Sequence, residues 1–171
     1  WQNLNALWHF CHSTVWSAAR HHPFTMADLR YPVGPFTAPA SFSTADRAAA
    51  IKTLAELPAR MRLASAGLSD TQLDTRYRPE GWTVRQVVHH TVDSHINAYL
   101  RTKFALSDDQ PTIRPYPEQI WAEMADAKTA PVSMSLTLLD ALHGRWVILL
   151  RSLTTAEFAR TLLHPERGPM T

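Results

Sequence analysis

Several features that define particular protein classes are missing from this sequence. One cysteine, Cys11, occurs in 171 residues, which excludes an intramolecular disulfide and a cysteine-rich zinc module and fits a reducing compartment. No apolar run approaches the roughly 18 residues that cross a bilayer, and the N-terminus shows no signal-peptide pattern. We therefore expect a cytoplasmic protein without a membrane partner.

Neither sign of charge predominates. The 17 lysine and arginine residues and the 15 aspartate and glutamate residues give a formal net charge of +2. Nucleic-acid binding needs a basic stripe, and acidic and basic residues are interspersed here, so we expect no nucleic-acid partner. The 5 glycines are few, and prolines cluster at residues 32–39 and 111–117. These clusters indicate connectors between long uninterrupted segments.

The two ends of the sequence differ from the rest. The sequence begins with Trp1 and ends with Met170-Thr171 without a terminating element, so we interpret it as a fragment. Residues 1–30 have few charges and poor helical spacing, and we expect an N-terminal extension of undefined role. Residues 31–171 are expected to form one helical domain that is incomplete at its C-terminus.

Helical periodicity and helix start signals recur along the rest of the chain. The predicted helices are 43–66, 83–106, 117–127 and 133–153, with short capped turns at 69–74 and from 154. Ser43, Thr83 and Ser133 are the expected N-caps of the long helices, and Pro58 is expected to kink the first. No strand-like alternation is present. The pattern predicts an all-α helical bundle, in which three long helices need a fourth from residues 1–22, a C-terminal segment or a partner chain.

The segment 81–95 concentrates the side chains best suited to chemistry. It carries His89, His90 and His95 together with Asp93 on one predicted helix. Imidazole suits both borderline metals and proton transfer near neutral pH. Successive helical residues are about 100° apart, so His95 falls on the apolar face, His89 on its edge and His90 nearly opposite. One interpretation is a hydrogen-bonded core His95 with the other histidines solvated; the other is a metal site.

A metal site needs more ligands than this helix offers. Catalytic sites of the zinc type take about three protein ligands, and a helix with no histidine pair four residues apart supplies one. His90 would need two further imidazoles, yet no H-x-x-x-H pair follows it, and His143 and His164 stand singly. His9 and His12, three residues apart, are the remaining candidates.

A series of motifs adds a resemblance to this interpretation. The sequence contains, in this order, Tyr-Pro-Val-Gly at 31–34, Gln-Leu-Asp-Thr at 72–75, Gly-Trp-Thr-Val-Arg-Gln-Val-Val-His-His at 81–90 with Asp-Ser-His at 93–95, Ile-Arg-Pro-Tyr at 113–116, Leu-His-Gly-Arg-Trp at 142–146 and His-Pro at 164–165. Over about residues 29–170 it resembles the DinB-like superfamily, and within it the YfiT-like metal-dependent hydrolases that are related to the bacillithiol transferases.

This resemblance implies a DinB/YfiT-like four-helix bundle that forms homodimers and binds nickel or zinc through three histidines. It assigns the first ligand to His90, which overrides the periodicity that favoured His95 as the inward residue. The family's other two ligands lie on a later helix, in a Trp-His-x-x-x-His pattern after the His-Pro loop, and we expect that helix to be missing from this sequence. Trp8-His9 echoes the pattern, but Ser13 stands where the second histidine is needed.

Two functions follow as hypotheses. The first is a metal-dependent hydrolase or thiol S-transferase, in which a histidine-bound divalent metal activates water or a thiol of a small-molecule substrate, such as a low-molecular-weight thiol. His90 would be a metal ligand, and His95 or Asp93 an orienting or proton-accepting residue. Three arginines are candidate substrate anchors, because a guanidinium grips a carboxylate bidentately: Arg85, Arg114 and Arg145.

The second hypothesis belongs to another class of protein. Two of the three ligands that the resemblance requires are absent from the sequence, so the chain could be a truncated, non-catalytic bundle domain. Such a domain would keep its helical surface for interaction or dimerisation.

Overall fold

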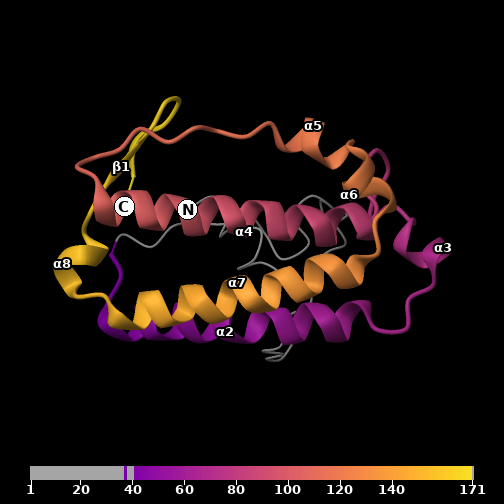
Figure 1. Cartoon of the computed structure of the whole chain (residues 1–171), viewed down its shortest axis with the longest axis horizontal. Helices are drawn as coiled ribbons and strands as arrows, with labels where there is room; N and C mark the ends of the chain where they lie inside the picture. The colour runs from indigo at the N-terminus through magenta and orange to yellow at the C-terminus, as the bar shows by residue number, and fades with distance from the viewer. Residues whose placement is uncertain (1–36, 38–40, 171) are drawn as a thin grey trace, which may run out of the picture.

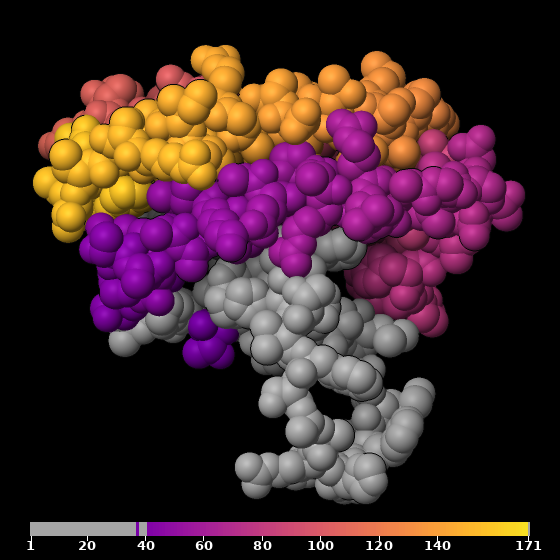
Figure 2. Space-filling view, turned by 90° about the horizontal axis from the view of Figure 1, so that it is seen from below, coloured from indigo at the N-terminus to yellow at the C-terminus, as the bar shows by residue number. Residues whose placement is uncertain are grey.

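Three long helices form the body of the part of the chain that the structure describes. A computed structural model describes residue 37 and residues 41–170. The long helices are α2 (Thr44–Ser65), α4 (Val84–Ser107) and α7 (Val132–Ser152). α2 runs antiparallel to α4, whereas α7 runs parallel to α4, because the segment 108–117 first crosses back along the bundle (Figure 1). Figure 2 shows α2 lying across one face of the molecule beside α7, against which it packs.

Short elements occupy the ends of the long helices. Four are short helices: α3 (Asp70–Leu73), α5 (Glu118–Ala122), α6 (Ala125–Thr129) and α8 (Thr155–Phe158). β1 (Leu162–His164) and β2 (Gly168–Met170) form an antiparallel hairpin. An isolated parallel bridge between Thr112 and Leu163 joins this hairpin to the crossing segment. The sequence predicted no strands, because strands of three residues are too short to show an alternating pattern.

Local capping chemistry sets the predicted helix starts. Reciprocal capping boxes begin four helices, as expected from the sequence, and they pair Ser43 with Asp46, Ser69 with Gln72, Thr83 with Gln86, and Thr154 with Glu157. α2 is followed by Gly67, whose φ of 73° lies in the left-handed region that favours glycine. The helix starts and the end of α2 that depend on residues close in the sequence could therefore be predicted from the sequence.

Two helix boundaries differ from the prediction. Ser133 is not an N-cap, since α7 already begins at Val132 after Pro131; proline is well tolerated where a helix starts, because the first N–H groups have no helical acceptor. The predicted helix at 117–127 is divided into α5 and α6. The buried Gln86 side chain donates to the carbonyl of Ala122 at 2.7 Å, so that carbonyl ends α5 and does not accept from a following helical turn.

The core lies where the three long helices meet, and the predicted apolar stripes supply it. One buried cluster consists of Leu57, Met61, Val88, Val92, Leu136 and Leu139. A second consists of Leu54, Tyr99, Trp146 and Val147. Because each stripe recurs at three- and four-residue steps, one face of each helix is buried and the other remains exposed. The all-α architecture is thus confirmed, with the small hairpin as an addition.

The predicted sources of a fourth helix remain open. Residues 1–22 lie outside the described residues, as does the whole of the predicted N-terminal extension, residues 1–30. Within residues 41–170, no helix combines the length and the apolar character needed to traverse a bilayer.

Truncation of the central core residue should destabilise the bundle strongly. Leu139 is 0% exposed, whereas its neighbour Leu138, about 100° further round α7, is 48% exposed. Leu139→Ala should lower the free energy of unfolding by about 2–5 kcal/mol, because it leaves a cavity. Leu138→Ala should change it by about 0.5 kcal/mol or less. Urea unfolding of both variants measures the difference, and equal effects would contradict the observed packing of α7.

Candidate functional site

His90 lies on α4 in an aromatic pocket. Its ring centroid is 4.5 Å from that of Trp82 and 6.3 Å from that of Tyr116. Trp82 is oriented by a hydrogen bond from its indole N–H to the Gln119 side chain at 3.2 Å, and Tyr116 packs on Trp121 at 4.8 Å. Burial lowers the pKa of His90 to about 4. The imidazole is therefore neutral at pH 7, with a lone pair available on one ring nitrogen.

Asp93 follows His90 by three residues, which places both side chains on one side of α4. Burial, with the charge of Asp126 as a further cause, raises the pKa of Asp93 to about 6. A carboxyl group with this pKa can both hold and accept a proton near neutral pH. Burial also raises the pKa of Tyr116, so the tyrosine keeps its proton. The arrangement suits proton transfer beside a neutral imidazole, and the catalytic role of Asp93 stays a prediction.

His95 lies on another face of the same helix, inside the core. It is 1% exposed. Its Nδ1 is 2.6 Å from Nε2 of His143 on α7, and Nδ1 of His143 is 2.6 Å from the carbonyl oxygen of Leu54 on α2. The interpretation of His95 as a hydrogen-bonded core histidine agrees with this geometry. Its predicted catalytic role stays a prediction.

The hydrogen-bond chain fixes which nitrogens carry protons. A carbonyl oxygen can only accept, so Nδ1 of His143 donates to Leu54, and the Nε2 of a neutral His143 must then accept from Nδ1 of His95. This leaves Nε2 of His95 unprotonated, buried and without a hydrogen-bond partner among the described residues. Burial lowers the pKa of both histidines, and for His95 the adjacent His143 lowers it further. Both rings are held in the neutral form.

The acceptor at Leu54 has a simple origin. In a regular helix the Leu54 carbonyl would accept from the N–H of residue 58, but Pro58 lies inside α2 and has no N–H. His143 supplies the missing donor from α7. The imidazole thereby offsets the cost of a proline in the middle of a helix, and α2 continues through Pro58 to Ser65.

His89 is a structural residue and is neither solvated nor paired with Asp93. It is 7% exposed. Its Nε2 lies 3.1 Å from the carbonyl oxygen of Ala130, to which it donates, and its Nδ1 lies 2.7 Å from the hydroxyl of Ser135. The interpretation of His89 as a solvated histidine is therefore wrong, because the start of α7 covers it. These contacts tie α4 to the segment before α7.

The three arginines proposed as substrate anchors lie apart. Arg85 is 5% exposed, and its guanidinium binds Asp74 at 2.7 Å, Asp70 at 2.7 Å and the carbonyl of Ala130 at 3.1 Å. These contacts hold α3 and the segment before α7 against the start of α4. Arg114 is exposed, and Arg145 lies over the Tyr99 ring at 5.9 Å. The structure does not bring the three together, and their substrate role stays a prediction.

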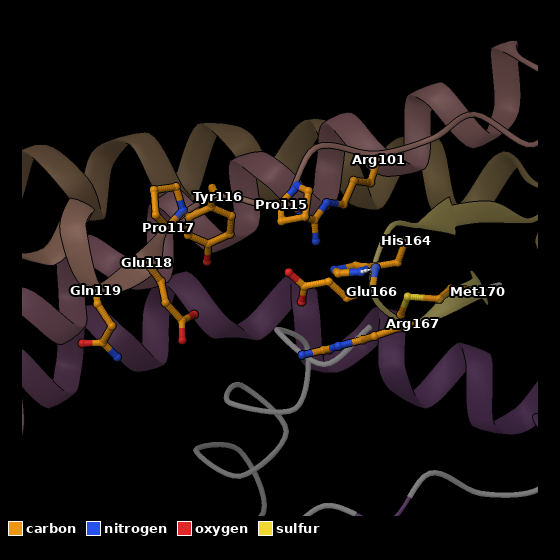
Figure 3. A pocket seen from close by; sticks show the side chains of 10 residues that line it. All are labelled: Arg101, Pro115, Tyr116, Pro117, Glu118, Gln119, His164, Glu166, Arg167 and Met170. Atoms are coloured by element: carbon orange, nitrogen blue, oxygen red, sulfur yellow. Dashed lines mark hydrogen bonds between the residues drawn. The ribbon is translucent and has the colours of Figure 1, made fainter.

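A cavity of about 390 Å³ lies between the crossing segment, α4 and the terminal hairpin. Figure 3 shows the side chains of Arg101 and Arg167 reaching toward it from α4 and from the hairpin. Tyr116 lines it as well, so the cavity shares one wall with the His90 pocket. Neither arginine belongs to a predicted motif, and position was the available signal, since Arg101 follows His90 by about three turns of α4.

The described residues do not assemble a metal site by themselves. No group of three histidine, cysteine, aspartate or glutamate side chains within residues 41–170 is arranged to hold an ion. His90 is one available imidazole, since it makes no hydrogen bond with another described residue, but His89 and His143 are engaged elsewhere. A three-histidine site of the predicted kind therefore needs donors beyond these residues.

Comparisons with known proteins give the family. The model of the DinB superfamily matches residues 53–171. A protein of Bacillus subtilis (strain 168) named "Putative metal-dependent hydrolase YfiT" is 49% identical over 142 residues, which cover 83% of this chain and 80% of the relative. A protein of Geobacillus thermodenitrificans (strain NG80-2) named "Putative metal-dependent hydrolase" is 51% identical over 142 residues, covering 83% and 79%.

A solved structure agrees with these matches. YfiT from Bacillus subtilis, described as a probable metal-dependent hydrolase with an unusual four-helix bundle topology, is similar with a TM-score of 0.81 and 48% identity, covering 84% of this chain and 82% of that chain. The chain belongs to the DinB superfamily. The predicted family and the predicted four-helix-bundle fold are confirmed, and residues 41–170 contribute three long helices of that fold.

The neutral histidine pair predicts a loss of stability in mild acid. The imidazoles of the unfolded chain take up protons below about pH 6.5, whereas folded His95 and His143 resist protonation. The free energy of unfolding should therefore fall as the pH is lowered from 7 to 5. His95→Gln removes one such group and should reduce this slope by about 1 kcal/mol per pH unit.

Asp93 provides a control, because its effect on the pH dependence of the free energy of unfolding has the opposite sign. Its raised pKa means that the folded protein takes up a proton between about pH 6 and pH 3.8 more readily than the unfolded chain does. This uptake stabilises the fold as the pH falls, so Asp93→Asn should make the acid-induced loss steeper. Urea unfolding at pH 7, 6 and 5 measures both slopes. Equal slopes for wild type and His95→Gln would contradict a neutral buried pair.

Proposed function

We propose that this protein is a metal-dependent hydrolase or thiol S-transferase of the YfiT type, with His90 as one ligand of a divalent metal. The observation that carries the proposal is the neutral imidazole of His90, half-buried between Trp82 and Tyr116 and free of hydrogen bonds to other described residues. Neutral imidazole is the form that binds metals such as nickel and zinc. The names of the relatives support a metal-dependent reaction.

The residues around His90 suit such a reaction. Asp93, with a pKa of about 6, can exchange a proton near neutral pH. Trp82 and Tyr116 exclude water from one side of the imidazole. The remaining ligands have to come from outside residues 41–170. The proposed substrate is a small molecule, with a low-molecular-weight thiol as the leading class.

A second candidate function is a non-catalytic bundle domain that binds a second copy or another protein. The observation that favours it is the lack, within residues 41–170, of a group of three metal-binding side chains. α7 also exposes Met134, Leu138 and Ile148, at 65%, 48% and 72%, and a helical partner could cover this apolar stripe. Metal binding distinguishes the two candidates.

Metal addition should stabilise the protein, and the effect should depend on His90. The test uses the full chain after removal of metals, with nickel or zinc added at 100 times the Kd. Ligand binding to the folded state alone then adds about 2.7 kcal/mol to the free energy of unfolding, which raises the Tm by several degrees. His90→Ala should abolish this rise, and Thr91→Ala, the next residue on α4, should retain it. If neither nickel nor zinc changes the Tm of the wild type, the result would favour the non-catalytic domain.

A further inference from the structure

The cavity beside the His90 pocket is lined by charged and polar side chains from three parts of the chain. Arg101 comes from α4, Tyr116 and Glu118 come from the crossing segment and the start of α5, and the hairpin adds three more. The hairpin residues are His164, Glu166 and Arg167. In Figure 3 these side chains converge on one hollow from opposite sides. A space of about 390 Å³ fits a small molecule.

The two arginines of this cavity form no ion pair with a carboxylate among residues 41–170. The ion pairs formed within residues 41–170 involve Arg85, Lys52 and Lys128, and none includes Arg101 or Arg167. One guanidinium nitrogen of Arg101 donates to the carbonyl of Arg114 at 3.4 Å, which holds its side chain against the crossing segment. Burial lowers the pKa of Arg101, and the positive charge of Arg167 lowers it further. Two cations thus lie near each other, and no carboxylate of the described residues is bound to either of them.

Such an arrangement costs free energy in the empty cavity and is relieved by an anion. Two like charges repel, and a half-buried guanidinium has lost part of its hydration. A carboxylate between them would accept charge-assisted hydrogen bonds from both planar groups. Arg85 shows the contrast within the same protein, since its guanidinium is saturated by Asp70 and Asp74. Arg85 thus stabilises the fold through its ion pairs, whereas Arg101 and Arg167 can still bind an anionic ligand.

We propose that Arg101 and Arg167 bind the carboxylate of a small-molecule substrate, and that Tyr116 separates this carboxylate from the reacting end of the substrate at His90. The proposal deepens the function proposed above and rests on it, because the bound molecule is a substrate only if the protein is an enzyme of that type. Tyr116 supports the placement, because its ring both lines the cavity and lies 6.3 Å from the imidazole of His90. A substrate that reaches from the two arginines to His90 would carry its carboxylate and its reactive group on opposite sides of the Tyr116 ring.

Glu118 and Glu166 also face the cavity and limit what can bind there. Neither forms an ion pair with another described residue. Their charges disfavour a ligand with several negative groups, so a monocarboxylate fits better than a phosphate dianion. Glu166 lies on the same hairpin as Arg167 and competes with a bound carboxylate for the two guanidinium groups. Its removal should therefore tighten binding.

The test compares two probes that differ in one charge. N-acetyl-L-cysteine carries a carboxylate, and N-acetyl-L-cysteine amide replaces it with a neutral group. Titration of the full chain, followed through the side-chain Nε–H signals of its arginines by nuclear magnetic resonance, gives a Kd for each probe. The acid should bind about tenfold more tightly than the amide, as expected for hydrogen bonds to a charged group, and should shift the signals of Arg101 and Arg167.

Variants assign this preference to the two arginines. Arg101→Gln and Arg167→Gln should each weaken binding of the acid about tenfold and leave binding of the amide unchanged. Glu166→Gln should tighten the acid several-fold. Lys52→Gln is the matched control, because it removes a positive charge from the exposed surface of α2, and it should leave both Kd values unchanged. Arg167 is exposed on the hairpin, so its variant remains informative even if Arg101→Gln fails to fold.

Equal affinity for acid and amide in the wild type would overturn the proposal, as would wild-type affinity for the acid in Arg167→Gln. The outcome is separable from that of the metal experiment. Binding of the acid needs no metal and should survive His90→Ala. If the acid binds through both arginines but neither nickel nor zinc stabilises the protein, the carboxylate site stands and the proposed metal-dependent function is wrong.

Discussion

The backbone carbonyl of Leu54 is the point on which the arrangement of the three long helices depends. Pro58 removes the donor that this carbonyl would have inside α2. A buried polar group without a partner costs about 1–3 kcal/mol, and His143 removes that cost from α7 while accepting from His95 of α4. One hydrogen-bond chain therefore sets how α2, α7 and α4 lie relative to each other. The apolar clusters on either side pack around this polar seam.

The periodicity of α4 places its histidines in different surroundings. His95 faces α7 and is committed to the seam, and His89 is committed to the segment before α7. His90 points to the other side, where Trp82 and Tyr116 surround it. Burial lowers the pKa of all three imidazoles. His89 and His95 are buried and hydrogen-bonded, whereas His90 is half-buried and makes no hydrogen bond to another described residue. Three histidines within seven residues of sequence thus lie in three different environments.

The sequence predicted what local chemistry decides. The capping boxes at Ser43, Thr83 and Thr154 fixed the helix starts, because each involves residues three apart. The features that it missed depend on distant residues. Gln86 divides α5 from α6 by binding Ala122, and no local pattern announces this. In the candidate site, the motif predicted His90 and Asp93, whereas the cavity of Arg101 and Arg167 forms only when the crossing segment and the hairpin meet.

The bridge between the crossing segment and the hairpin makes these two segments one mechanical unit. Ile113 donates its N–H to the carbonyl of Leu163 at 2.9 Å, and Leu163 donates its N–H to the carbonyl of Pro111 at 2.9 Å. β1 is thereby hydrogen-bonded to the segment that leads to Tyr116. The position of Tyr116 in the aromatic wall beside α4 therefore depends on the hairpin as well as on the crossing segment itself.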